Sequence, residues 1–110
     1  MIDINGTDIT LSKGDTFDVI FQIENYVINK TDKIIFTVKQ SCLKNSSALI
    51  KQEFENITDN TIHVLISAED IEKIGSGTKL YDLVVETVEG RRTTLTKPSK
   101  LHLCEVVHDL

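Results

Sequence analysis

The sequence predicts an all-β protein made of two facing sheets, and three observations lead to this class. Short runs of alternating apolar and polar residues recur along the 110 residues, and a period of two is typical of strands with one buried face. Turn-forming Gly, Asn and Asp residues separate these runs. Only one short segment has a helical pattern. Strands joined by turns, without repeated helices between them, favour an antiparallel sandwich over a parallel α/β sheet.

The composition indicates one globular domain over residues 1–110, large enough to form a core without disulfides or a metal. Apolar residues make up 40% and charged residues 26%, which argues against disorder. The net charge of -5 disfavours a nucleic-acid partner, which requires clustered Lys and Arg. No apolar run approaches the roughly 18 residues of a membrane span, and the acidic N-terminus does not resemble a signal peptide. We therefore expect no membrane partner and synthesis in a cytoplasm.

Asn5-Gly6 is expected to form a turn between a short leading segment and residues 7–11, and Lys13-Gly14-Asp15 forms another turn before the first of two strands with clear alternation. The residues expected to face the core are Phe17, Val19, Phe21 and Ile23 in the first strand and Ile34, Phe36 and Val38 in the second. Ile20 breaks the first pattern because it is apolar on the outer face, so an edge loop or a partner is expected to cover it. Tyr26 and Val27 add an apolar patch to the polar segment that follows.

The middle of the chain predicts two further strands and the helix. Residues 49–56 form a weaker strand with Ile50 and Phe54 inward, and the turn signal Asp59-Asn60 predicts a hairpin with residues 61–67. In that second strand the inward set is Ile62, Val64 and Ile66. Ser67 followed by Asp70 is a helix-capping pattern, and Gly75 can end the segment. This one- or two-turn helix is expected to cross between the sheets.

A hairpin over residues 77–95 organises the C-terminal part, with its turn at Glu89-Gly90. Its inward residues are Tyr81, Leu83 and Val85. Pro98 has no N–H to donate and should lie at a strand boundary or bulge, before a last strand over residues 101–107. The total is about seven or eight strands. Because Trp is absent and the Cys spacing differs from an antibody domain, the sandwich is immunoglobulin-like only in a loose sense.

The two cysteines, Cys42 and Cys104, match no metal or redox motif. Both lie in strand-like runs, which favours two thiols buried as small hydrophobic side chains. A bridge between sheets stays open as an alternative, since strands distant in sequence often meet in a sandwich.

No arrangement of residues predicts catalysis or a cofactor. His102, Cys104 and His108 would share one side of a strand, but the two histidines would lie roughly 20 Å apart along it, too far for one zinc ion. His63 is expected outward on its strand as a surface residue. The sequence contains neither a nucleophile-elbow nor a zinc-protease motif. We therefore expect a protein that is not an enzyme.

Two stretches resemble small structural proteins of tailed bacteriophages and prophages, including the N-terminal domain of baseplate upper proteins. The first is Lys13-Gly14-Asp15-Thr16-Phe17, which resembles the entry into the first long strand of that family. The second follows the family's order of short helix, Gly, Tyr-Asp-apolar strand, Gly turn and Thr-Leu return strand, in Ser67–Asp70, Gly77, Tyr81-Asp82-Leu83, Gly90 and Thr94-Leu95. The sequence departs from the family at Asn29–Asp32, where an Asp-Leu-Thr-Gly type of turn is usual.

The resemblance implies a non-enzymatic adaptor of a phage or prophage-derived tail or baseplate, located in the virion. Its partners would be other phage structural proteins, with homo-oligomers in the assembly and no catalytic residue, cofactor or metal. Without a fibre or receptor-binding region, the chain would be a stand-alone module. The partner-docking surface is predicted at Ile20, Tyr26 and Val27, through edge strands and exposed apolar positions.

A ligand-binding sandwich, such as a carbohydrate-binding or surface adhesion module, is the alternative. Sugar sites usually stack aromatic rings, and this chain has 5% aromatic residues, no Trp and mostly inward phenylalanines. An enzyme or metal protein is a third alternative.

Overall fold

The structure, a computed structural model, describes residues 2–5, 7–12, 14–24, 26–41 and 47–104. Its described part is all-β with one short helix. The elements in chain order are β1 (Ile2–Asn5), β2 (Asp8–Ser12), β3 (Phe17–Gln22), β4 (Lys33–Lys39), β5 (Ala48–Phe54), β6 (Thr61–Ile66), α1 (Ala68–Lys73), β7 (Gly77–Glu86) and β8 (Arg92–Cys104). No described helix is long and apolar enough to cross a membrane.

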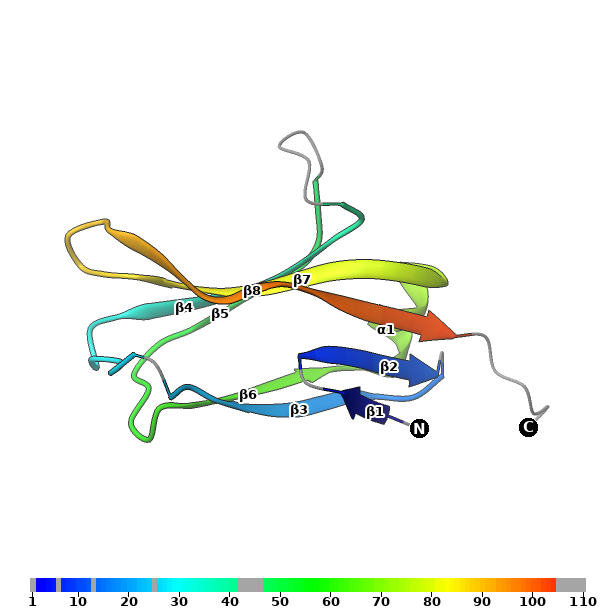
Figure 1. The fold of residues 1–110 in the computed structure, drawn as a ribbon, viewed down its shortest axis with the longest axis horizontal. Coiled ribbons are helices and arrows are strands. Elements are labelled where there is room, and N and C mark those ends of the chain that lie inside the picture. The colour runs from blue at the N-terminus through cyan, green and yellow to red at the C-terminus, as the bar shows by residue number, and fades with distance from the viewer. Residues whose placement is uncertain (1, 6, 13, 25, 42–46, 105–110) are drawn as a thin grey trace.

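The strands form two sheets of very different size. The larger sheet has six strands in the order β1-β2-β8-β7-β4-β5, and the smaller has β3 and β6 alone. Figure 1 shows β3 and β6 as one layer below the layer of β4, β5, β7 and β8, with α1 near one end. The side chains between the two layers form the core.

The larger sheet is mixed, which corrects the prediction of purely antiparallel sheets. β2 pairs with β8 in parallel, with Ile9 opposite Leu101 and Leu11 opposite Leu103, whereas the other described pairs are antiparallel. Nearly the whole chain separates β2 from β8, so this pairing leaves no local turn signal in the sequence. The pairing buries Ile9, Leu11, Leu101 and Leu103, which were not among the residues predicted to face the core.

The core matches the predicted alternation closely. Of the fifteen residues expected inward, twelve are buried, and Phe21, Ile50 and Phe54 are partly buried against the same cluster. Phe17, Phe21, Phe36 and Tyr81 pack as tilted rings with centroids 5.7–6.1 Å apart, which joins β3 to β4 and β7. The remaining buried apolar residues are Ile9, Leu11, Ile28, Ile71, Leu101 and Leu103.

α1 carries the chain from the smaller sheet to the larger, as predicted. The Ser67 hydroxyl caps it by accepting a hydrogen bond from the Asp70 backbone N–H at 3.1 Å. Glu69 and Asp70 place acids in the first turn, where the helix dipole favours them. Ile71 is buried and fixes the helix against the core, and Gly75 follows with a φ of 80°.

The β7–β8 hairpin is confirmed, but its second arm is one strand of 13 residues rather than two strands separated at Pro98. Tyr81 lies opposite Ser99 and Leu83 opposite Thr96, so two residues of β8 oppose Asp82 alone, which is a β-bulge. Pro98 falls within this bulge, where a missing N–H is tolerated. The Thr96 hydroxyl compensates nearby by accepting from the Leu83 N–H at 3.0 Å. Residues 105–107 of the predicted last strand lie outside the described residues.

β5 and β6 do not form the predicted hairpin. β5 pairs with β4 in the larger sheet and β6 pairs with β3 in the smaller one. The turn at Asp59-Asn60 exists, with Asn60 at a φ of 54°, but it directs the chain across the sandwich. A turn signal fixes a change of direction, and it does not specify which strand pairs next.

Candidate docking surface

The candidate site is the smaller sheet, whose strand β3 has an unpaired edge. Among the described strands only β6 pairs with β3. A strand edge of this kind presents free backbone N–H and C=O groups, onto which another strand can add.

The register identifies the backbone groups that face this open edge. In an antiparallel pair, residues alternate between pairs that exchange hydrogen bonds and pairs that do not. The Ile23 N–H donates to the Asn60 carbonyl at 2.8 Å, and continuing this register makes Phe21, Val19 and Phe17 the residues bonded to β6. The backbone groups of Asp18, Ile20 and Gln22 therefore point away from β6, toward the open edge.

The outer edge of β6 differs because a side chain of the larger sheet occupies part of it. The Gln52 Nε2 of β5 donates to the Leu65 carbonyl at 3.1 Å. Leu65 lies opposite Asp18, so this bond also agrees with the assigned alternation. Of the two edges of the smaller sheet, that of β3 is the more accessible for strand addition.

The outer face of this sheet carries exposed apolar side chains. Ile20 is 66% exposed and Leu65, on the neighbouring strand, is 54% exposed. Ile20 lies opposite His63, whose Nε2 is 2.5 Å from an Asp18 carboxylate oxygen. His63 is exposed, as predicted, and a surface pair of this kind contributes at most about 1 kcal/mol. The patch of Ile20 and Leu65 is left uncovered by the described chain.

The segment after β3 is held in place by one side chain of the β5–β6 connection. The Asn60 Nδ2 donates to the carbonyls of Ile23 and Tyr26, at 3.0 and 2.5 Å, and its Oδ1 accepts from the Ile28 N–H at 2.9 Å. The three bonds fix the backbone on both sides of Val27. The backbone around Val27 is therefore held in one position, with the Val27 side chain exposed.

The three residues of the predicted docking surface have different environments. Ile20 lies on the outer face of β3, and Val27 is 79% exposed in the segment that follows. Tyr26 is only partly exposed and packs against the core. Ile20 and Val27 are thus available to a partner, while most of Tyr26 supports the loop.

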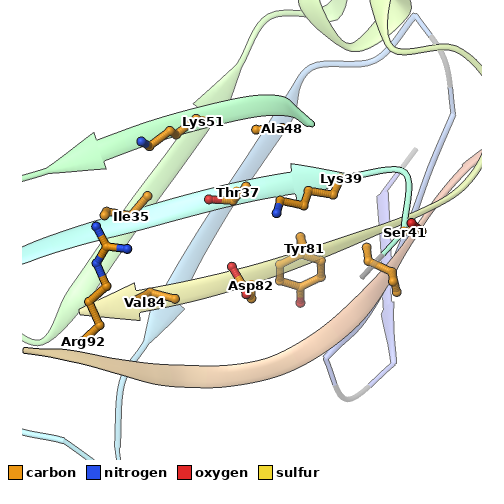
Figure 2. Close-up of a pocket in the computed structure, with 11 residues that line it drawn as sticks. Ile35, Thr37, Lys39, Ser41, Ala48, Lys51, Tyr81, Asp82, Val84 and Arg92 are labelled. Carbon is orange, nitrogen blue, oxygen red and sulfur yellow. The ribbon is translucent and has the colours of Figure 1, made fainter. Parts of the chain in front are cut away.

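A shallow groove of about 530 Å³ lies on the outer face of the larger sheet. Figure 2 shows its lining side chains, from β4, β5, β7 and the start of β8. Asp82 lies in it opposite Thr37 of the neighbouring strand, between Leu80 and Val84 on its own strand. Lys39, Lys51 and Arg92 also line the groove.

The carboxyl of Asp82 is partly desolvated in this groove. Burial raises the pKa of Asp82, and the positive charge of Lys39 lowers it in part. Arg92 and Lys51 also lie near acids, with Arg92 Nε 2.8 Å from Glu86 Oε2 and Lys51 Nζ 3.8 Å from Glu53 Oε1. The groove is mixed in charge, so it favours neither a simple anion nor a simple cation.

Two of the residues considered for metal binding, His102 and Cys104, lie in the described part of β8. His102 Nδ1 lies 2.8 Å from the Thr78 hydroxyl, and Cys104 is exposed rather than buried, which corrects the expectation for this thiol. Cys104 follows the buried Leu103 at the end of β8, so the alternation of the strand places it on the outward side. Cys42 and His108 lie outside the described residues. Within the described ranges, no three His, Cys, Asp or Glu side chains group to hold a metal ion.

Several features of this surface were not predicted from the sequence. Leu65 falls on the outward positions of its strand, so its alternation with Val64 and Ile66 was a usable signal. Asn60 was recognised as a turn residue, but its three bonds depend on segments more than thirty residues away. Val88, 75% exposed beside the β7–β8 turn, is a further apolar surface position.

Comparison with known proteins does not identify a family. No protein-family model matches the chain, and no curated protein is significantly similar to it in sequence.

Proposed function

We propose that the chain is a non-enzymatic structural module of a phage or prophage-derived particle, of the tail or baseplate adaptor type. It acts by protein–protein assembly, with phage structural proteins as partners and the virion as its location. Support comes from the resemblance at residues 13–17 and 67–95. The observation that carries the proposal is the open edge of β3 together with the exposed Ile20.

Strand addition is the mechanism of docking in this proposal. An incoming extended segment bonds to the backbone groups of Asp18, Ile20 and Gln22, and an apolar side chain on it covers Ile20. A two-stranded sheet gains most from such an addition, because isolated two-stranded ribbons are only marginally stable. Val27, held out by the Asn60 bonds, extends the contact beyond the strand.

We also infer an immunoglobulin-like arrangement. The order β8-β7-β4-β5 facing β3-β6 corresponds to strands G-F-C-C′ facing strands B-E of that fold. In this assignment, no described strand takes the positions beside B and E that other strands usually fill. The edge of β3 is therefore unpaired within the described part of the chain.

The test is mass spectrometry of particles purified from the source bacterium after prophage induction. The proposal expects this protein at a fixed ratio to known tail or capsid proteins. Ile20→Lys places a charge on the open edge, and strand addition should then fail, so the variant should be lost from particles. Leu49→Lys, on the edge strand β5 of the other sheet, is the matched control and should be retained. Absence of the wild-type protein from particles, with abundant protein in the lysate, would reject the proposal.

The ligand-binding alternative is favoured by one observation, the groove around Asp82. Its volume lies within the range of small-molecule sites. Among the described residues that line it, Tyr81 is the one aromatic residue, and it is 2% exposed and packs into the core, so it provides no ring for stacking a sugar. Screening of glycans and small polar ligands by NMR tests this alternative, with shifts at Thr37, Asp82 and Val84 as the expected signature of binding.

A further inference from the structure

We infer that the segment added to β3 is β3 of a second copy of the chain, in an antiparallel register with Ile20 at the two-fold axis. This inference rests on the proposed function, because it names the partner of the docking edge described above. The result is a continuous four-stranded sheet, in the order β6-β3-β3-β6, across two copies.

Backbone geometry limits the possible registers. Asp18, Ile20 and Gln22 are the residues of β3 whose N–H and C=O groups face the open edge. Two copies related by a two-fold axis can exchange hydrogen bonds only if these residues lie opposite one another.

Side-chain chemistry selects one register among these. With Ile20 on the axis, Ile20 lies opposite Ile20 of the second copy, and Asp18 lies opposite Gln22 of the second copy. An apolar pair is then flanked by two carboxylate–amide pairs, in which the amide can donate a hydrogen bond.

The neighbouring registers are worse for identifiable reasons. An axis at Asp18 places two carboxylates directly opposite, which is destabilising. An axis at Val19 places each Ile20 opposite a charged Asp18, and an axis at Phe21 places Asp18 opposite Glu24. The chosen register is the one that buries the exposed Ile20 against another apolar side chain without like charges in opposition.

The contact is isologous, because the same patch on both copies forms it. Val19 would lie opposite Phe21 of the second copy on the core side of the joined sheet. His63 flanks Ile20 on β6 of each copy, so the outer face becomes a row of His63, Ile20, Ile20 and His63. Leu65 and Thr61 lie at the two ends of the patch.

Cysteine cross-linking tests the register directly, in a background where Cys42 and Cys104 are replaced by Ser. Ile20→Cys places two thiols at a hydrogen-bonded pair, where the Cα atoms are about 5.5 Å apart, within the range of a disulfide. Gln22→Cys is the matched control, because two such residues would be four positions out of register, roughly 13 Å along the strand. The double variant Asp18→Cys/Gln22→Cys should cross-link again, through the two symmetric pairs.

The expected result is a disulfide dimer from the Ile20→Cys chain and from the double variant, and loss of that dimer in the Gln22→Cys chain. Equal cross-linking of the three chains, or none in any of them, would overturn the inference. Unfolding curves of the reduced variants establish that each chain is folded before oxidation.

The outcome is separable from that of the proposed function. If the protein is present in particles but its Ile20→Cys variant does not cross-link, only the two-fold pairing is contradicted. A chain that cross-links as expected but is absent from particles contradicts the particle assignment alone.

Discussion

The two sheets of this sandwich share one core but differ in how their backbones are satisfied. In the larger sheet, β2, β8, β7 and β4 each pair on both sides, whereas in the smaller sheet β3 and β6 each pair with no other described strand. Both sheets direct fully buried side chains inward, such as Phe36 from one and Phe17 from the other. The difference teaches that stability comes from the shared inner faces, while the incomplete backbone pairing of the smaller sheet is the feature on which the docking proposal rests.

The largest predicted effect compares an inner-face residue of the larger sheet with an outer-face residue of the smaller one. Phe36→Ala removes a fully buried ring from the centre of the aromatic cluster, and unfolding free energy should fall by about 3–5 kcal/mol. Ile20→Ala should change it by less than about 0.5 kcal/mol, because the side chain is mostly exposed. Urea unfolding of dilute protein measures both. A cost for Ile20→Ala similar to that for Phe36→Ala would mean that the chain itself covers Ile20.

The Asn60 bonds give the next largest effect. Asn60→Ala leaves two carbonyls and one N–H without their partner and keeps a positive φ, so we expect a loss of about 3 kcal/mol. Asn56→Ala is a control for the backbone term, since Asn56 has a φ of 57°, and it should cost about 1 kcal/mol. Chemical denaturation compares the two variants. Equal losses would show that the side-chain bonds add nothing to the fixed position of Val27.

A smaller effect concerns the way the larger sheet holds its N-terminal strands. The Tyr81 hydroxyl donates to the Thr7 carbonyl, and the Ser99 hydroxyl donates to the Thr7 hydroxyl at 2.9 Å. Tyr81→Phe keeps the ring in the core and removes one bond, so it should cost about 1 kcal/mol. Thermal unfolding of Tyr81→Phe against wild type measures this loss. An unchanged unfolding temperature would mean that a water molecule donates to the Thr7 carbonyl in place of the phenol.

The smallest predicted effect is a pH dependence at Asp82. Because the pKa of Asp82 is raised from 3.8 on folding, the folded chain holds this proton more tightly than the unfolded chain does. The contribution of Asp82 to stability therefore falls as pH rises through the window above 3.8. Asp82→Asn removes this loss, so the stability of the variant relative to wild type should increase as pH rises above 3.8. A variant that becomes relatively less stable toward neutral pH would indicate that attraction to Lys39 outweighs desolvation.

The alternation of side chains predicted most of the fold because burial on one face imposes a local period of two. It located the strand positions of β3, β4, β6 and β7, and twelve of the fifteen residues expected inward are buried. The cap at Ser67 and the turn at Gly90 were also predictable, since both depend on a few neighbouring residues.

Pairing between distant strands was not predictable in the same way. The parallel contact of β2 with β8 and the separation of β5 from β6 depend on which surfaces meet in the folded chain. Of the candidate site, the outward apolar Ile20 was visible in the sequence, because it violates the alternation of β3. The open edge of β3 could not be predicted, because the alternation within one strand does not show which neighbouring strands are absent.

Residue-specific amide hydrogen exchange over β3 tests the central claim most directly. In dilute chain, the N–H groups of Val19 and Phe21 should exchange slowly because they bond to β6, while those of Asp18, Ile20 and Gln22 should exchange rapidly. At high protein concentration the second group should become protected as the edge acquires a partner strand. Slow exchange of the Ile20 amide in dilute chain, or rapid exchange that is unchanged at high concentration, would contradict the account.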